Sequence, residues 1–149
     1  MSQPILIVED SADDAQLLRS QLRRAGLCNP CHAVSSAEEA ITYLEGAPPY
    51  EDRSRFPAPA VILLDIKLPG LDGHQFLQWI NARPNLAGIL VVVISGADDL
   101  SSIRRAYQLG ARSFITKPCS VAELQNLFHG FPGYWTRTPL SVGPMTVGD

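Results

Sequence analysis

The stretch VILLDIKLPGLDG, residues 61–73, decides the fold class. Its first four residues are apolar and form a run too short for a helix, which predicts a buried strand ending at Asp65. A loop follows and leads to a helix that carries Phe76, Leu77 and Ile80. The stretch therefore predicts a strand, a loop and a helix, with an acid at the carboxyl end of the strand.

Similar units occupy the chain on both sides of this stretch. Four other short apolar runs predict strands: Ile5 to Val8, His32 to Val34, Ile89 to Ile94 and Ser113 to Thr116. A segment with helical spacing of apolar residues follows each of them. Five alternations of strand and helix favour an α/β fold, with a doubly wound five-stranded parallel sheet and helices on both faces.

The composition narrows the class of protein. The chain has 149 residues, of which 46% are hydrophobic and 18% charged, which suggests one domain with an ordinary core. The net charge is -3 and there is no basic cluster, so we expect no nucleic-acid partner. We find neither a signal peptide nor a run of about 18 apolar residues, and we expect a cytoplasmic protein that does not enter a membrane.

Two segments lack a regular pattern. Residues 46–59 hold four prolines and predict an irregular surface loop. We place the domain at residues 1–130 and a tail, extended or partly disordered, at 131–149. The tail aromatics Phe131, Tyr134 and Trp135 either contact a partner or fold back on the last helix. We expect no second domain after residue 130, and therefore output through protein contacts.

The cysteines and histidines do not indicate a redox or metal centre. Cys28 and Cys31 have C-x-x-C spacing, but they follow a helix and lead into a strand, where no helix N-terminus lowers a thiol pKa. Two cysteines in a turn is the simpler interpretation. The histidines at positions 32, 74 and 129 share no metal-ligand spacing, which favours surface or packing roles.

Polar residues follow or end four of the predicted strands. Glu9 and Asp10 follow the first, Asp65 the third, Ser95 the fourth and Lys117 the fifth. Because the carboxyl ends of parallel strands share one edge of a sheet, we expect these side chains to meet. Crowded carboxylates favour Mg²⁺, and a carboxylate can attack phosphorus to form an acyl phosphate. Mg²⁺, Lys117 and Ser95 could each neutralise one phosphoryl oxygen.

These motifs resemble the response-regulator receiver domain of two-component systems. The motifs are Glu9-Asp10, the stretch around Asp65, Ser95-Gly-Ala, and FITKP, residues 114–118. The resemblance covers roughly residues 4 to 130. It implies a flavodoxin-like (βα)5 receiver fold with strand order 2-1-3-4-5. It also implies phosphorylation of Asp65 by a histidine kinase in a phosphorelay.

The resemblance assigns the metal ligands and the phosphoryl-binding groups. Asp10, Asp65 and the backbone carbonyl of Lys67 would bind Mg²⁺ directly, and Glu9 would act on the metal mainly through water. Ser95 would donate a hydrogen bond to the phosphoryl group and Lys117 would pair with it.

The resemblance also implies a switch and a partner. Phe114 falls at the aromatic switch position, where tyrosine is frequent, and the Lys117-Pro118 peptide is expected to be cis. The irregular loop and the pair Tyr134-Trp135 look like the stand-alone regulators of phytochrome-type histidine kinases. The output would be a downstream protein target or a homodimer. The chain would not be an enzyme beyond catalysing its own aspartyl phosphorylation and dephosphorylation.

Two other functions fit parts of the sequence. A small phosphatase with an aspartate nucleophile would want a general acid two residues after Asp65, but that position holds Lys67. A flavodoxin-like flavin binder would want a Ser/Thr/Gly-rich phosphate loop after the first strand. Glu9 and Asp10 begin an acidic loop there that would repel a phosphate.

Overall fold

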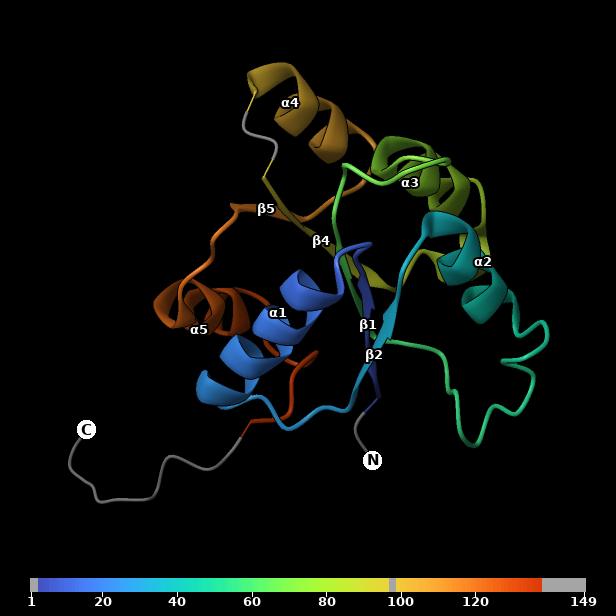
Figure 1. The fold of residues 1–149 in the computed structure, drawn as a ribbon, viewed down its shortest axis with the longest axis horizontal. Coiled ribbons are helices and arrows are strands. Elements are labelled where there is room, and N and C mark those ends of the chain that lie inside the picture. The colour runs from blue at the N-terminus through green and yellow to red at the C-terminus, as the bar shows by residue number, and fades with distance from the viewer. Residues whose placement is uncertain (1–2, 97–98, 138–149) are drawn as a thin grey trace.

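The computed structural model describes residues 3–96 and 99–137, which form one parallel sheet flanked by helices (Figure 1). The strand order is β2-β1-β3-β4-β5, which confirms the predicted doubly wound fold. The described elements, in chain order, are β1 (Ile5–Val8), α1 (Ala12–Arg24), β2 (Cys31–Val34), α2 (Ala37–Glu45), β3 (Val61–Leu64), α3 (Gly73–Asn81), a 3₁₀ turn (Pro84–Leu86), β4 (Leu90–Ser95), α4 (Leu100–Gln108), β5 (Ser113–Thr116) and α5 (Val121–Gly130).

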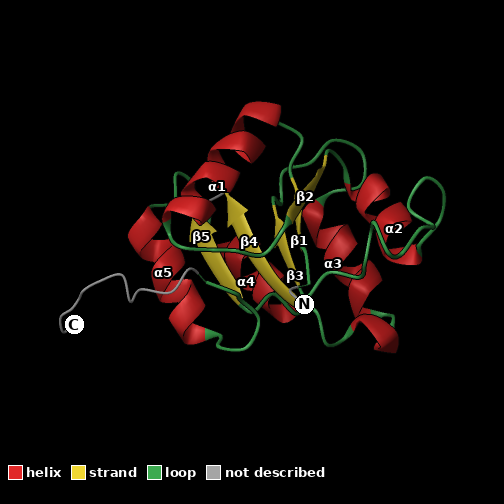
Figure 2. Ribbon diagram, turned by 90° about the horizontal axis from the view of Figure 1, so that it is seen from below, coloured by secondary structure: helices red, strands yellow, loops and turns green. Residues whose placement is uncertain are grey.

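The sheet separates two hydrophobic cores. Side chains alternate across β1, so that Leu6 and Val8 join one core while Ile5 and Ile7 join the other. Helices α2, α3 and α4 cover the first core, and α1 and α5 cover the second. Figure 2 shows the strands between these two layers of helices. Burial on both faces explains why the three central strands, β1, β3 and β4, are nearly continuous apolar runs rather than alternating ones.

Side-chain caps start the five described α-helices. The Ser11 hydroxyl accepts a hydrogen bond from the Asp14 N–H at 3.2 Å, and Ser36 caps α2 in the same way.

The largest difference between the predicted and the observed strands is at β4, which ends at Ser95 rather than at position 94. Ser95 stays in the sheet because it pairs with Thr116 of β5.

Residues 46–59 form the predicted irregular loop, but part of the loop is buried. The segment has no regular structure, but Tyr50 is buried and its ring packs with those of Tyr43, His32 and Phe56. Arg53 donates hydrogen bonds to two carbonyls at the carboxyl end of α2, at 2.8 and 3.0 Å. The loop therefore closes one core and caps a helix.

The first seven residues of the predicted tail contact the domain through the partly buried Phe131, Tyr134 and Trp135. The indole of Trp135 lies 4.7 Å from the Phe128 ring of α5, and the Cys28 N–H donates to the Thr136 carbonyl at 2.6 Å. The second of the two alternatives, folding back on α5, therefore holds for Trp135. Residues 138–149 lie outside the described part of the chain, so a domain boundary at 130 stays a prediction.

None of the described helices has both the length and the apolar character needed to cross a membrane.

Candidate phosphoacceptor site

The sheet brings most of the predicted site residues to one edge. Val8 is paired with Leu64, and Leu64 with Val93, so the residues after β1 and β3 lie beside the end of β4. Lys117 follows β5, and its backbone N–H donates to the Ser95 carbonyl at 2.9 Å. Four strands thus deliver acids, a hydroxyl and an ammonium to the same place.

Three carboxylates form the centre of this site. One oxygen atom from each of Glu9, Asp10 and Asp65 lies within 4.8 Å of the other two. Glu9 and Asp65 are buried and Asp10 is exposed. Burial raises the pKa of Glu9, although a hydrogen bond from Lys117 opposes that shift. Buried acids this close repel one another, and a divalent cation would relieve the repulsion.

Hydrogen bonds fix the direction of the Asp65 side chain. Its Oδ1 atom accepts from the Ser95 hydroxyl at 2.6 Å and from the Lys67 backbone N–H at 3.0 Å. Its Oδ2 atom accepts from the Lys117 ammonium at 3.0 Å. Ser95 is fully buried. The groups that would bind a phosphoryl group thus already touch the carboxylate that would carry it.

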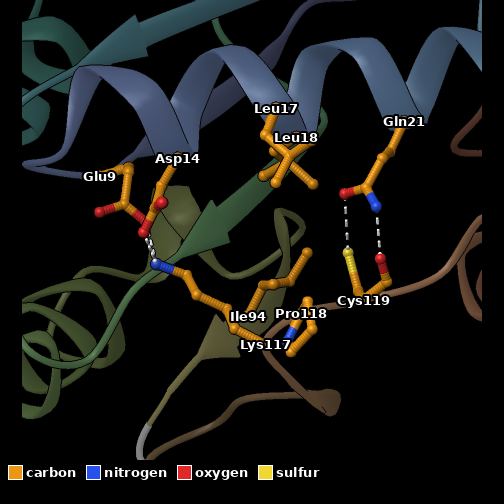
Figure 3. A pocket seen from close by; sticks show the side chains of 9 residues that line it. All are labelled: Glu9, Asp14, Leu17, Leu18, Gln21, Ile94, Lys117, Pro118 and Cys119. Atoms are coloured by element: carbon orange, nitrogen blue, oxygen red, sulfur yellow. Dashed lines mark hydrogen bonds and ion pairs between the residues drawn. The ribbon is translucent and has the colours of Figure 1, made fainter.

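Lys117 is paired with three carboxylates. Its Nζ atom lies 2.5 Å from Glu9, 3.0 Å from Asp65 and 3.0 Å from Asp14. Figure 3 draws Lys117 with Glu9 and Asp14. Burial lowers the pKa of Lys117, but the hydrogen bonds to the three acids outweigh it and hold the pKa above its ordinary value. The group therefore stays an ammonium at any physiological pH. The Lys117-Pro118 peptide is cis, as expected.

The structure places Phe114 and Lys67 without testing their expected roles. Phe114 is half-buried and packs against the core under α2, α3 and α4. Lys67 is exposed, and its backbone N–H, rather than its ammonium, contacts Asp65. The switch role of Phe114 and the role of the Lys67 carbonyl in metal binding stay predictions.

Sequence reasoning missed Asp14 as a site residue. Asp14 lies in the first turn of α1, where acids stabilise a helix, so its sequence position indicates an ordinary helix-start residue. Its contact with Lys117 joins residues 103 positions apart, which no local pattern indicates. The one available signal was its position in the first turn after the acidic pair.

None of the described histidines and cysteines belongs to the acidic cluster. His32 is packed among aromatic rings, His74 Nε2 lies 3.1 Å from the Ser102 carbonyl, and no disulfide joins the described cysteines. Burial raises the pKa of Cys31, which disfavours the reactive thiolate. Both observations agree with packing and turn roles.

The comparison with known proteins agrees with this geometry. The model of the response regulator receiver domain matches residues 5–129. The chain belongs to this family. The receiver domain is 31% identical over 140 residues to the probable methanogenesis regulatory protein FilR2 of Methanothrix harundinacea, covering 94% of this chain and 88% of that protein.

Solved structures of response regulators, one of them a bacteriophytochrome response regulator, are similar to this receiver domain. The bacteriophytochrome response regulator AtBRR matches with a TM-score of 0.80 and 30% identity, over 93% of this chain and 98% of that one. The Mn²⁺-bound form of Rcp1 matches with a TM-score of 0.72 and 29% identity, over 86% and 90% of the two chains. Rcp1 is a response regulator of Synechocystis.

The acidic cluster of this receiver domain fits a metal ion of the family type. All three of its side chains offer carboxylate oxygens, the donors that hard divalent cations prefer. The exposed position of Asp10 leaves one side of the cluster open to solvent. An ion bound there could keep water ligands on that side, as Mg²⁺ usually does.

Proposed function

We propose that this receiver domain accepts a phosphoryl group on Asp65 from a histidine kinase, with Mg²⁺ held by Asp10, Asp65 and the Lys67 carbonyl. One observation supports the proposal above all others. The Asp65 carboxylate accepts hydrogen bonds from both Ser95 and Lys117 while lying within the acidic cluster. The nucleophile, the cation site, the hydroxyl and the ammonium thus meet at the Asp65 carboxylate.

The transfer step follows from these positions. A carboxylate oxygen of Asp65 attacks the phosphorus of a phosphohistidine, the P–N bond breaks and the histidine nitrogen leaves with its electron pair. Mg²⁺, when bound, supplies positive charge beside the phosphoryl oxygens. Lys117 stabilises a second oxygen and the Ser95 hydroxyl donates to a third. The products are an aspartyl phosphate and a neutral histidine, once the histidine nitrogen has taken a proton.

The same contacts connect phosphorylation to a change of shape. Ser95 and Lys117 now bind the Asp65 carboxylate, and they would exchange it for phosphoryl oxygens in the phosphorylated state. A shift of Ser95 moves the end of β4, which pairs with β5 beside Phe114. The phosphoryl group thereby favours one of two arrangements of this region, which is a population shift.

The family and one relative support a choice of partners. Receiver domains receive phosphoryl groups from histidine kinases, and similarity to the bacteriophytochrome response regulator AtBRR favours a kinase of the phytochrome type. Output goes through contacts with a downstream protein or through a homodimer. The only chemistry that the domain catalyses is its own phosphorylation and dephosphorylation.

The test is labelling by acetyl phosphate in the presence of Mg²⁺. Wild-type protein should gain one phosphoryl group by intact-mass spectrometry, and Asp65→Asn should gain none. Asp72→Asn is the matched control, because Asp72 lies in the same loop but caps α3. Equal labelling of the Asp65→Asn variant and wild type would falsify the assignment.

A further inference from the structure

Asp14 has no role in the chemistry proposed above, although its carboxylate lies 3.0 Å from the Lys117 ammonium. Figure 3 shows Lys117 reaching from the end of β5 toward the first turn of α1, where Asp14 meets it. The Asp14 side chain is 48% exposed, whereas those of Glu9 and Asp65 are 6% and 8% exposed. Asp14 therefore holds the ammonium from the solvent side.

The number of donors explains what this contact does. A lysine ammonium has three N–H groups, and here three carboxylates accept from it. A lysine head otherwise turns freely on a flexible stem of four carbons. Glu9 and Asp65 hold two of the N–H groups inside the site, and Asp14 takes the third.

We propose that Asp14 is a positioning residue that restrains Lys117 and lowers the reactivity of the site toward small anionic phosphoryl donors. This inference rests on the proposed phosphorylation of Asp65. Asp14 acts in two ways. It competes with the incoming phosphoryl oxygens for the ammonium, and it adds a fourth carboxylate to Glu9, Asp10 and Asp65 where an anion must approach.

The reaction with acetyl phosphate makes both effects measurable. An Asp65 oxygen forms a bond to phosphorus, the bond between phosphorus and the acetyl oxygen breaks, and acetate leaves with the electron pair. The donor carries negative charge past Asp14, so removal of that charge should lower the donor concentration needed for half-maximal rate. An exposed ion pair of this kind predicts a change of about two- to five-fold.

Asp13 provides a matched control. It precedes Asp14 in the first turn of α1 and is also exposed, so both acids interact with the same helix terminus. The three carboxylates bonded to Lys117 belong to Glu9, Asp14 and Asp65, and Asp13 is not among them. Asp13→Asn and Asp14→Asn change the net charge equally, so a difference between them depends on the position of Asp14 beside Lys117 and not on net charge.

The experiment measures the phosphorylation rate of the full chain against acetyl phosphate concentration, with saturating Mg²⁺, for wild type, Asp13→Asn, Asp14→Asn and Asp14→Glu. Asp14→Asn should lower the half-saturating concentration about two- to five-fold, and less at high salt, while Asp13→Asn matches wild type. Asp14→Glu keeps a carboxylate, so its half-saturating concentration should be close to that of wild type. If Asp14 only stabilised the fold, Asp14→Asn would lower the maximal rate instead.

The outcomes separate this inference from the function on which it rests. Wild-type protein that is not labelled at all overturns the phosphorylation of Asp65, and with it the role of Asp14. If wild type is labelled but Asp13→Asn and Asp14→Asn give indistinguishable curves of rate against acetyl phosphate concentration, only the role of Asp14 is overturned.

Discussion

Replacement of Lys117 by methionine should tighten Mg²⁺ binding, because the ammonium and the cation compete for the same carboxylates. Nζ of Lys117 lies 2.5 Å from Glu9 Oε1 and 3.0 Å from Asp65 Oδ2, and both acids belong to the acidic cluster. The lysine thus stabilises the metal-free site and opposes a second cation in it. Methionine keeps an unbranched side chain while removing the charge.

Coulomb's law gives the size of the effect. A divalent ion and an ammonium separated by about 4 Å repel each other by about 2 kcal/mol even in bulk water, twice the value for two unit charges. Partial burial strengthens this repulsion, and reorganisation of the acids weakens it. Relief of about 2 kcal/mol corresponds to about 30-fold in Kd. We expect Mg²⁺ to bind about 10- to 30-fold more tightly to the Lys117→Met variant.

Isothermal titration with MgCl₂ measures this difference directly. Arg24→Met is the control, because it removes one positive charge from the exposed far end of α1. The control should bind Mg²⁺ like wild type. Thermal melts give a second reading, since Mg²⁺ should raise the Tm of Lys117→Met by more than that of wild type. Equal or weaker Mg²⁺ binding by Lys117→Met would refute the competition.

Three further substitutions test other parts of the structure. Gly73→Ala should destabilise the fold by about 1–3 kcal/mol in urea titrations and slow phosphorylation, because a Cβ there would lie 2.5 Å from the backbone after the phosphoacceptor. Gly88 has open space around it, so Gly88→Ala should change neither the stability nor the phosphorylation rate. Arg53→Ala should lower the free energy of unfolding by about 2–3 kcal/mol in the same assay, because three hydrogen bonds to backbone carbonyls are lost. Arg55 only lies over the Phe56 ring, so Arg55→Ala should lower it by less than about 1 kcal/mol. Burial lowers the pKa of His32, so the unfolded chain takes up the proton first, and stability should fall as pH drops below about 6.5. His32→Gln should remove this part of the pH dependence from thermal melts.

The strands and the convergence at the sheet edge could be predicted because they depend on local patterns. The runs from Ile5 to Val8 and from Val61 to Leu64 are buried on both faces, so their composition alone marks their bounds. Once the strands are parallel, the residues that follow them must share an edge. The meeting of Asp65 with Lys117 was therefore predictable without any knowledge of side-chain geometry.

The contacts that were missed join segments far apart in the sequence. Residues 46–59 look like a solvent-exposed loop because proline and charge dominate them, yet Tyr50 and Phe56 are held by rings from β2 and α2. Asp14 looks like an ordinary helix-start residue, and its ion pair with Lys117 depends on how α1 lies across the end of β5. Such contacts depend on tertiary packing rather than on propensity.

The most direct test of the central claim locates the phosphoryl group by peptide mass spectrometry. Protein treated with acetyl phosphate and Mg²⁺ is reduced with borohydride, which converts an aspartyl phosphate to homoserine, and is then digested. Homoserine should replace aspartate at position 65 and at no other acid, and it should disappear when Mg²⁺ is removed with EDTA. Conversion at Glu9 or Asp10, or an unmodified peptide around Asp65, would contradict the account.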